Sequence, residues 1–195
     1  PYSRLLLEKM RERFPKALII AGGEHITAMT EFSFRECPAL DVAVLGEGEE
    51  TLLELVNRHA AGKGWEGCAG AAWFKDGRLQ KGPARNRIRE VDEIPKPAWD
   101  LLPTENYLKS NNMFGVHRGR SLAVLATRGC PYKCTFCSNP RMYGKLWAAR
   151  SPELLLDEIE ELITNYGVEN VDFYDLTMVL KREWILEFCR RIEER

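Results

Sequence analysis

The sequence predicts an α/β protein in which short buried strands alternate with amphipathic helices. Two features of the chain lead to this prediction. Apolar runs of strand length, such as residues 17–21 and 41–45, end directly in glycine-containing turns. Helical patterns, in which apolar residues recur every three or four positions, follow these turns. Because this order is typical of parallel sheets, a ligand site is expected where the strands end.

The first third of the chain has the pattern of a doubly wound domain. Ser3 can cap a helix that ends at Pro15, and buried strands are expected over 17–21 and 41–45. Four positions form the stripe of the helix after the second strand: Leu52, Leu55, Val56 and His59. The order helix, strand, helix, strand, helix predicts the C-terminal half of a doubly wound domain over residues 1–64.

Both strands of this segment run into turns that contain glycine. Gly22 and Gly23 follow the first strand, and Gly46, Glu47 and Gly48 follow the second. Glycine lets the backbone N–H groups of such a turn approach a ligand closely. A tight turn between strand and helix is the structural alternative, so the glycines alone are a weak indication of a site.

Residues 65–120 are expected to form a hairpin and a proline-rich linker. The Asp-Gly pair at 76–77 lies between apolar residues, which is a hairpin signal. Residues 92–103 are rich in proline and predict an extended connection between domains. Trp99 and Leu101 are expected to pack this linker down.

The last part of the chain, residues 121–195, predicts a parallel βαβ pattern. A buried strand is expected over 121–127 and another over 168–174. Between them, Ser151 is expected to cap a helix and Gly167 to end it. A final helix has an apolar stripe at five positions: Trp184, Ile185, Phe188, Cys189 and Ile192.

Three cysteines lie close together after the first of these strands, which places them at a strand end. Cys130, Cys134 and Cys137 have the spacing C-x3-C-x2-C. Three thiolates can hold three irons of a cubane cluster and leave the fourth iron open to a ligand. A structural zinc site needs four ligands, and the nearest histidine is His117. The spacing alone favours an iron–sulfur cluster and leaves zinc open.

Composition and charge limit the remaining classes of function. The formal net charge of −1 does not suggest a nucleic-acid or membrane partner. Five arginines are expected on solvated faces: Arg85, Arg87, Arg89, Arg118 and Arg120. No apolar run approaches a membrane span and no signal peptide is visible, so a cytoplasmic protein is expected. Cys37, Cys68 and Cys189 are expected to be ordinary small apolar residues.

The cysteine segment resembles the start of a radical S-adenosylmethionine (SAM) enzyme. That family uses C-x3-C-Φ-x-C, with Φ aromatic, after the first strand of a partial TIM barrel. Cys130, Cys134 and Cys137 match the pattern, and Phe136 matches the aromatic position. The resemblance implies a [4Fe–4S] cluster that cleaves SAM to a 5′-deoxyadenosyl radical, with Phe136 near the adenine. It also implies a small-molecule substrate and an electron donor such as flavodoxin or ferredoxin.

Asp175 follows the predicted strand 168–174. Many members of this family place a Gly-Gly-Glu element at this point to contact the SAM ammonium group. The sequence here departs from that element, and Asp175 is a candidate substitute because a carboxylate can accept from an ammonium. A turn or helix-capping role is an equally weighted alternative.

The two glycine turns resemble those of a cobalamin-binding domain. That family has a Gly-Gly-x-His-x-Thr turn and a Gly-Glu-Gly-Glu turn, which match residues 22–27 and 46–49. The resemblance implies that Gly22, Gly23, Gly46, Glu47 and Gly48 lie along the nucleotide tail of cobalamin. The sequence contains no Asp-x-His-x-x-Gly element, which supplies the cobalt ligand in many members.

Together, the resemblances imply the C-terminal half of a flavodoxin-like cobalamin-binding domain followed by the first βα units of a partial TIM barrel. The expected domains are residues 1–64, the bridge 65–120 and the barrel start 121–195. Because a complete barrel needs more units, we expect an internal segment of a longer protein. The predicted activity is cobalamin-dependent methyl transfer, with no catalytic side chain assigned. A cyclase or rearranging enzyme, and a non-enzymatic zinc or iron–sulfur module, are the alternatives.

Overall fold

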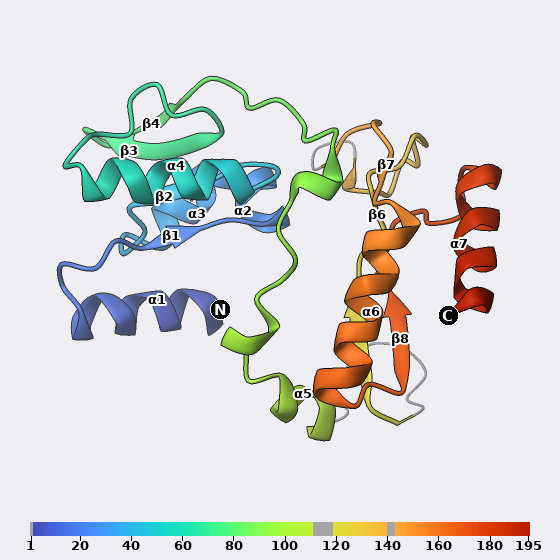
Figure 1. Ribbon diagram of the computed structural model, residues 1–195. Coiled ribbons are helices and arrows are strands. Elements are labelled where there is room, and N and C mark those ends of the chain that lie inside the picture. The colour runs from blue at the N-terminus through green and yellow to red at the C-terminus, as the bar shows by residue number, and fades with distance from the viewer. Residues whose placement is uncertain (1, 111–118, 140–142) are drawn as a thin grey trace. The chain divides into compact units, whose positions relative to one another are not determined.

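The computed structural model describes residues 2–110, 119–139 and 143–195 (Figure 1). The chain forms two compact units. The first unit contains residues 1–88 and 133–144, and the second contains residues 89–132 and 145–195. His117, the candidate fourth zinc ligand, and Arg118 lie outside the described residues. No helix among the described residues is both long and apolar enough to cross a membrane.

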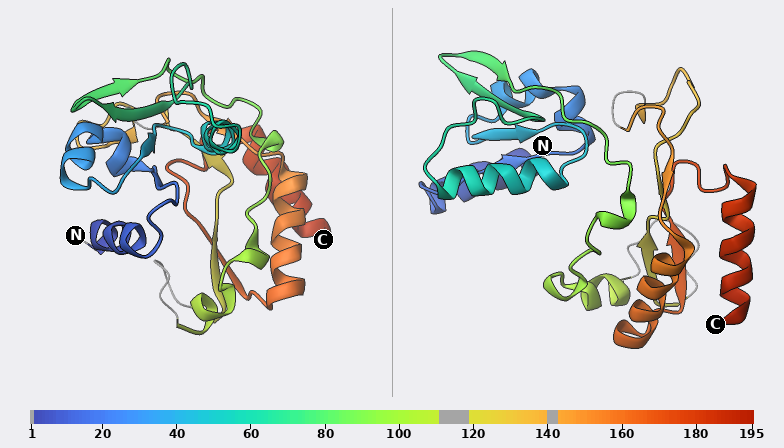
Figure 2. Two further views of the ribbon diagram at one scale, coloured as in Figure 1. Left: turned by 90° about the vertical axis from the view of Figure 1, so that its left-hand side faces the viewer. Right: turned by 45° about the horizontal axis from the view of Figure 1, so that its top comes forward.

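The first unit is built on a four-stranded sheet with helices packed against it (Figures 1 and 2). In sheet order the strands are β1 (Ile20–Ala21), β2 (Val42–Val44), β3 (Ala71–Lys75) and β4 (Arg78–Lys81). The first two strands are parallel, with Ile20 opposite Val42, and the last two are added antiparallel. The helices are α1 (Tyr2–Arg13), α2 (Glu24–Ala28), α3 (Thr30–Glu36) and α4 (Glu49–Ala60). The predicted strands over 17–21 and 41–45 are therefore present in shortened form.

Helices cover both faces of this sheet. Ala43 packs in one core cluster with Phe34 of α3, while its neighbour Val42 packs in another with Leu55 of α4. Successive residues of a strand point to opposite faces, so β2 is buried on both. This double burial explains why residues 41–45 form a continuous apolar run rather than an alternating one.

The stripe expected on α4 is only partly correct. Leu55 is fully buried as predicted, but Leu52 and Val56 are 46% and 49% exposed, and Thr51 is buried instead. Positions 51 and 55 are four residues apart and share the face of α4 that packs against the sheet. Leu52 and Val56 lie one residue further along the chain, about 100° around the helix, and so fall beside that face.

The predicted hairpin is formed by β3 and β4, and it continues the sheet. Asp76 and Gly77 at its tip both have positive φ, at 51° and 72°, as a two-residue hairpin turn of type I′ requires. Phe74 lies opposite Leu79 across the hairpin, and Ala72 of β3 lies opposite Ala43 of β2. The first unit therefore extends beyond residue 64, as far as Ile88.

The second unit contains a parallel strand pair and a short antiparallel pair. Its strands are β5 (Ser121–Val124), β6 (Thr127–Arg128), β7 (Ala148–Ala149) and β8 (Asn170–Phe173). Its helical segments are η1 (Val91–Glu93), η2 (Trp99–Leu101), α5 (Thr104–Ser110), α6 (Pro152–Tyr166) and α7 (Arg182–Glu194). β5 and β8 pair in parallel and α6 connects them, which confirms the predicted βαβ order (Figure 1). The predicted strand 121–127 is divided, because its last residue belongs to β6, which pairs with β7.

Local signals set the ends of α6 as predicted. The Ser151 side chain accepts a hydrogen bond from the Leu154 N–H group at 3.4 Å, and Pro152 occupies the first helical position. Gly167 ends the helix in the left-handed conformation, with φ of 60°. The apolar face of α6 packs into a core cluster of the second unit through Leu155 and Leu162.

Three positions of the second unit differ from the expectation. Cys189 and Ile192 are exposed, because α7 packs through Trp184, Ile185 and Phe188, whereas Cys37 and Cys68 are buried as expected. Leu101 is 80% exposed and does not pack the linker down. Within the linker, Trp99 packs against the core of the second unit, whereas Leu101 ends the single turn η2 that begins at Trp99.

Candidate metal and cofactor site

The cysteine loop begins directly after β6. Gly129, between β6 and Cys130, has a φ of 83°, a conformation that favours glycine and turns the chain into the loop. Cys130 belongs to the second unit, while Cys134 and Cys137 belong to the segment grouped with the first. The Cys137 N–H group donates to the Cys134 carbonyl at 3.1 Å, which closes a tight turn between these two cysteines.

Cys130, Cys134 and Cys137 form no disulfide, and Cys134 is exposed. Thiolates are soft ligands that suit zinc and iron–sulfur clusters. Within the described ranges, no three Cys, His, Asp or Glu side chains converge in a way that could hold a metal ion. The convergence of Cys130, Cys134 and Cys137 on one cluster therefore stays a prediction from their spacing.

Asp175 holds the backbone that leads into the cysteine loop. Its carboxylate accepts hydrogen bonds from the Ala126 N–H group at 3.1 Å and from the N–H and hydroxyl groups of Thr127. Burial raises the pKa of Asp175 above its ordinary value, and these hydrogen bonds oppose the rise. The structure thus shows the turn-bracing role that was one of the two alternatives for Asp175. A contact with SAM stays a prediction.

Thr177, which the sequence reasoning missed, is close to the first cysteine. Its Oγ1 lies 3.1 Å from the Sγ of Cys130, and its carbonyl accepts a hydrogen bond from the Trp147 indole N–H group at 2.8 Å. The only sequence signal for Thr177 is its place just after β8, at the end of a strand parallel to the one that leads to the loop.

Phe136, the predicted adenine contact, is 91% exposed. Single exposed apolar side chains are common on folded domains, and the exposed ring leaves its faces available to a ligand. Phe136 thus lies on the cysteine loop and belongs to none of the core clusters of the described residues.

The two glycine turns of the first unit lie together. They follow β1 and β2, which are parallel neighbours, and the Gly46 N–H group donates to the Thr27 hydroxyl oxygen at 3.1 Å. A Cβ atom added to Gly23 or Gly46 would meet no other atom within 4 Å, so open space adjoins both. At Gly22, by contrast, it would make ordinary van der Waals contact with Val44 at 3.5 Å.

Gly48 and Glu47 also have structural explanations. A Cβ atom on Gly48 would come within 3.3 Å of a Val44 side-chain carbon. The buried Glu47 carboxylate accepts from Arg87 at 2.7 Å and from the Ile88 N–H group at 2.9 Å. The expectation that Arg87 lies on a solvated face is therefore wrong, because its guanidinium neutralises a buried carboxylate.

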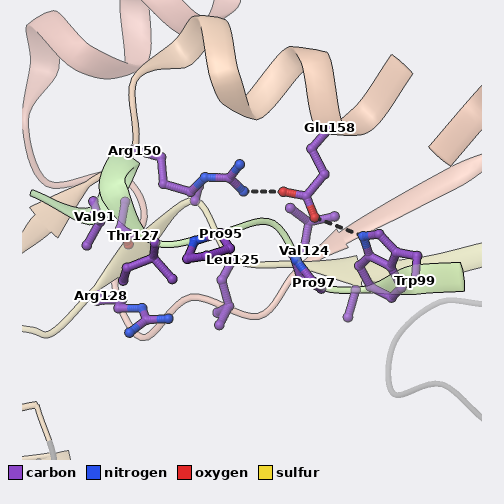
Figure 3. A pocket seen from close by; sticks show the side chains of 13 residues that line it. Val91, Pro95, Pro97, Trp99, Val124, Leu125, Thr127, Arg128, Arg150 and Glu158 are labelled. Carbon is purple, nitrogen blue, oxygen red and sulfur yellow. Dashed lines mark hydrogen bonds and ion pairs between the residues drawn. The ribbon is translucent and has the colours of Figure 1, made fainter. Parts of the chain in front are cut away.

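A pocket of about 170 Å³ in the second unit lies between the linker and the strands β5 and β6 (Figure 3). At its edge, the buried Glu158 carboxylate accepts from the Trp99 indole N–H group at 3.1 Å and forms an ion pair with Arg150. Figure 3 shows this chain of contacts from the helix to the linker. The carboxylate thus connects α6 to the proline-rich segment, which the sequence reasoning did not foresee.

Three closely spaced cysteines after the opening strands of a parallel βαβ unit are typical of α/β domains that bind an iron–sulfur cluster or zinc. Comparison with known proteins makes the class specific. Residues 124–195 match the Radical SAM superfamily. This part of the chain belongs to that superfamily, and the resemblance based on the cysteine spacing is confirmed.

Relatives of the chain match most of its length. An uncharacterized methyltransferase, PH0819, of Pyrococcus horikoshii is 36% identical over 90% of this chain. The anaerobic magnesium-protoporphyrin IX monomethyl ester cyclase of Cereibacter sphaeroides is 33% identical over 95% of it. The chain spans 37% and 30% of the lengths of these two relatives, respectively.

A solved structure shares the fold. The cobalamin-dependent S-adenosylmethionine radical enzyme OxsB, with aqua-cobalamin and S-adenosylmethionine bound, has a TM-score of 0.77 to this chain at 20% sequence identity. The match covers 98% of this chain and 26% of that one. The mixed α/β fold predicted from the sequence is therefore confirmed.

Proposed function

We propose that this chain is part of a radical SAM enzyme whose [4Fe–4S] cluster is held by Cys130, Cys134 and Cys137. One observation carries the proposal: three cysteines in the C-x3-C-x2-C spacing lie in a parallel βαβ unit that matches the Radical SAM superfamily, and they form no disulfide. When bound, such a cluster supplies the electron that cleaves SAM to a 5′-deoxyadenosyl radical.

The donor set fits this group better than it fits zinc. Three thiolates satisfy three irons and leave the fourth iron open, where the amino and carboxylate groups of SAM would bind. Zinc in a structural site requires a fourth ligand. The motif supplies three thiolates, from Cys130, Cys134 and Cys137, which is the number that a cluster with one open iron needs.

The residues around the loop have distinct proposed roles. Phe136, which is 91% exposed, would pack against the adenine of SAM. Asp175 braces Ala126 and Thr127, and it would thereby set the direction in which the chain enters the loop. The same carboxylate is the candidate partner of the SAM ammonium group.

The finer fold that we propose consists of two incomplete domains. The first unit corresponds to the C-terminal half of a flavodoxin-like cobalamin-binding domain. The second unit corresponds to the first βα units of a partial TIM barrel. Parallel pairing of β1 with β2 and of β5 with β8 supports both assignments, because both fold types are built on parallel strands.

Cobalamin would lie along the two glycine turns of the first unit. Gly23 and Gly46 have positive φ values of 91° and 71°, and open space adjoins both. Their backbones could therefore approach the nucleotide tail closely. Gly22 and Gly48 would lie against Val44 at the base of these turns. Glu47 would hold the second turn through its contact with Arg87.

We propose methyl transfer to a small molecule as the overall reaction, with cobalamin as the methyl carrier. The relation to an uncharacterized methyltransferase at 36% identity supports it. Ring closure is the second candidate, because a cyclase is 33% identical over 95% of this chain. A reduced flavodoxin or ferredoxin would supply the electron in either case.

The test is anaerobic reconstitution of the full-length protein with iron and sulfide. About four irons per chain, a charge-transfer absorption that bleaches on reduction, and release of 5′-deoxyadenosine from SAM are expected. Alanine at Cys130, Cys134 or Cys137 should abolish SAM cleavage. Cys189→Ala is the matched control, because this thiol is exposed and lies far along the chain from the loop. One zinc and no iron per chain would overturn the proposal.

A further inference from the structure

Thr177 occupies a defined position beside the first thiol of the loop. It lies in the connection between β8 and α7, and its Oγ1 is 3.1 Å from the Sγ of Cys130. An oxygen and a sulfur this close are within hydrogen-bonding reach, since sulfur is larger than oxygen and its hydrogen bonds are longer. The two residues are separated by 47 positions in the sequence, so the fold creates this contact.

Aromatic side chains hold Thr177 in place. Its carbonyl accepts from the Trp147 indole N–H group at 2.8 Å. The Trp147 ring meets the Trp184 ring edge to face at 6.3 Å, and the Lys181 ammonium lies 5.4 Å from its centroid. Packed aromatic groups have few alternative rotamers, so the hydroxyl is presented to Cys130 from a firm support.

The direction of the hydrogen bond follows from the state of the sulfur. A neutral Cys130 thiol could donate to the Thr177 oxygen, but a thiolate that ligates iron has no proton to donate. The Thr177 hydroxyl has a single proton, and the Leu176 carbonyl at 2.7 Å is its other acceptor. A hydrogen bond to an anion is about twice as strong as one between neutral groups, so the thiolate should win this competition.

We propose that Thr177 donates a hydrogen bond to the cluster-bound thiolate of Cys130 and thereby raises the reduction potential of the cluster. This inference rests on the proposed function. Reduction adds one electron, and the added negative charge is shared with the thiolate sulfurs. A donor to one sulfur stabilises the reduced state more than the oxidised one, as hydrogen bonds to cluster sulfurs do in general. Thr177 is thus a positioning and tuning residue rather than a catalytic one.

The experiment compares the reduction potential of the cluster in the wild type and four variants of the reconstituted full-length protein. Thr177→Val keeps the side-chain shape and removes the hydroxyl, whereas Thr177→Ser retains it. Thr164→Val makes the same chemical change at an exposed position of α6. Iron and sulfide contents are measured first, and the reduced fraction is then followed by electron paramagnetic resonance at controlled potentials.

Thr177→Val is expected to lower the potential, so the ratio of reduced to oxidised cluster at a fixed potential should fall several-fold. A tenfold fall would correspond to about 59 mV for one electron. Thr177→Ser should keep the reduction potential close to that of the wild type, because it retains the hydroxyl. Thr164→Val should leave the potential unchanged. Thr177→Ala serves as a second hydroxyl-free variant and should shift the potential in the same direction.

The outcomes separate this inference from the proposed function. A fully loaded cluster whose potential is the same in wild type, Thr177→Val and Thr177→Ala would overturn the role of Thr177 and leave the cluster assignment standing. A wild-type protein that binds no iron would overturn the proposed function itself. An equal shift in Thr177→Ser and Thr177→Val would also overturn the inference, because the hydroxyl would then have no specific effect.

Discussion

Glu158 connects the proline-rich linker to α6, and its removal provides a quantitative test of that contact. The side chain is 1% exposed, accepts from Trp99 at 3.1 Å and pairs with Arg150. In Glu158→Ala, the Trp99 N–H group loses its acceptor and the Arg150 guanidinium loses its counter-charge. Arg150 is itself largely buried, with 18% of its side chain exposed, so water can replace the carboxylate only in part.

The expected magnitude follows from this burial. Breaking a buried ion pair by removing one partner costs about 3–5 kcal/mol. The residual exposure of Arg150 places Glu158→Ala near the lower end, at about 3 kcal/mol in the free energy of unfolding. Glu158→Gln keeps an acceptor for Trp99 and loses only the charge. Its cost should therefore be smaller, roughly 1–2 kcal/mol, because hydrogen bonds to a charged group contribute about 1 kcal/mol more each than neutral ones.

The same helix and linker supply the matched control. Glu161 of α6 pairs with Lys96 of the linker, but these side chains are 39% and 49% exposed. Glu161→Ala should cost only about 0–1 kcal/mol, as exposed ion pairs do. The assay is urea unfolding of the full-length variants followed by tryptophan fluorescence, to which Trp99 itself contributes. If Glu158→Ala costs no more unfolding free energy than Glu161→Ala, burial of the Glu158 carboxylate does not make its contacts more stabilising.

Two further predictions concern the approach to the cysteine loop. Gly129→Ala places a Cβ atom on a residue with a φ of 83°, which should cost about 1–2 kcal/mol of stability and lower the iron content after reconstitution. Gly62→Ala is the control, because its φ of 65° gives similar strain and its iron content should stay unchanged. Asp175 has a pKa raised above 3.8 by burial, so its protonation contributes stability at low pH that is lost as pH rises through the raised value. In urea unfolding at a series of pH values, the unfolding free energy of the wild type minus that of Asp175→Asn should therefore fall as the pH rises just above 3.8. A difference that stays constant with pH would contradict this prediction.

Features that depend on neighbouring residues could be predicted from the chain. Ser151 and Gly167 set the ends of α6 because a cap and a left-handed residue act within one helical turn. The Asp76-Gly77 turn forms its hairpin for the same local reason. The cysteine spacing indicated the radical SAM superfamily, because all three cysteines of its motif lie on one short loop and are visible in the local sequence.

Features that depend on distant residues could not be predicted in this way. Asp175 braces Ala126, which is 49 positions away, and Trp99 meets Glu158 across 59 positions. Sequence patterns identify which side chains are polar, but they do not identify their partners when the chain must fold to bring them together. The exposure of Leu52 and Cys189 is of the same kind, because the packing of α4 and α7 decides which positions are covered.

The fold class and the three thiols that would hold the cluster follow from patterns within the chain. What surrounds Cys130 depends on the tertiary structure: Asp175 holds the backbone before the loop, and the Thr177 hydroxyl lies beside the sulfur. This is because β8 pairs in parallel with β5, so the residues after β8 lie beside the segment that leads from β5 through β6 to the loop. Spacing along the chain therefore identifies the ligands, while strand pairing sets their hydrogen-bond partners.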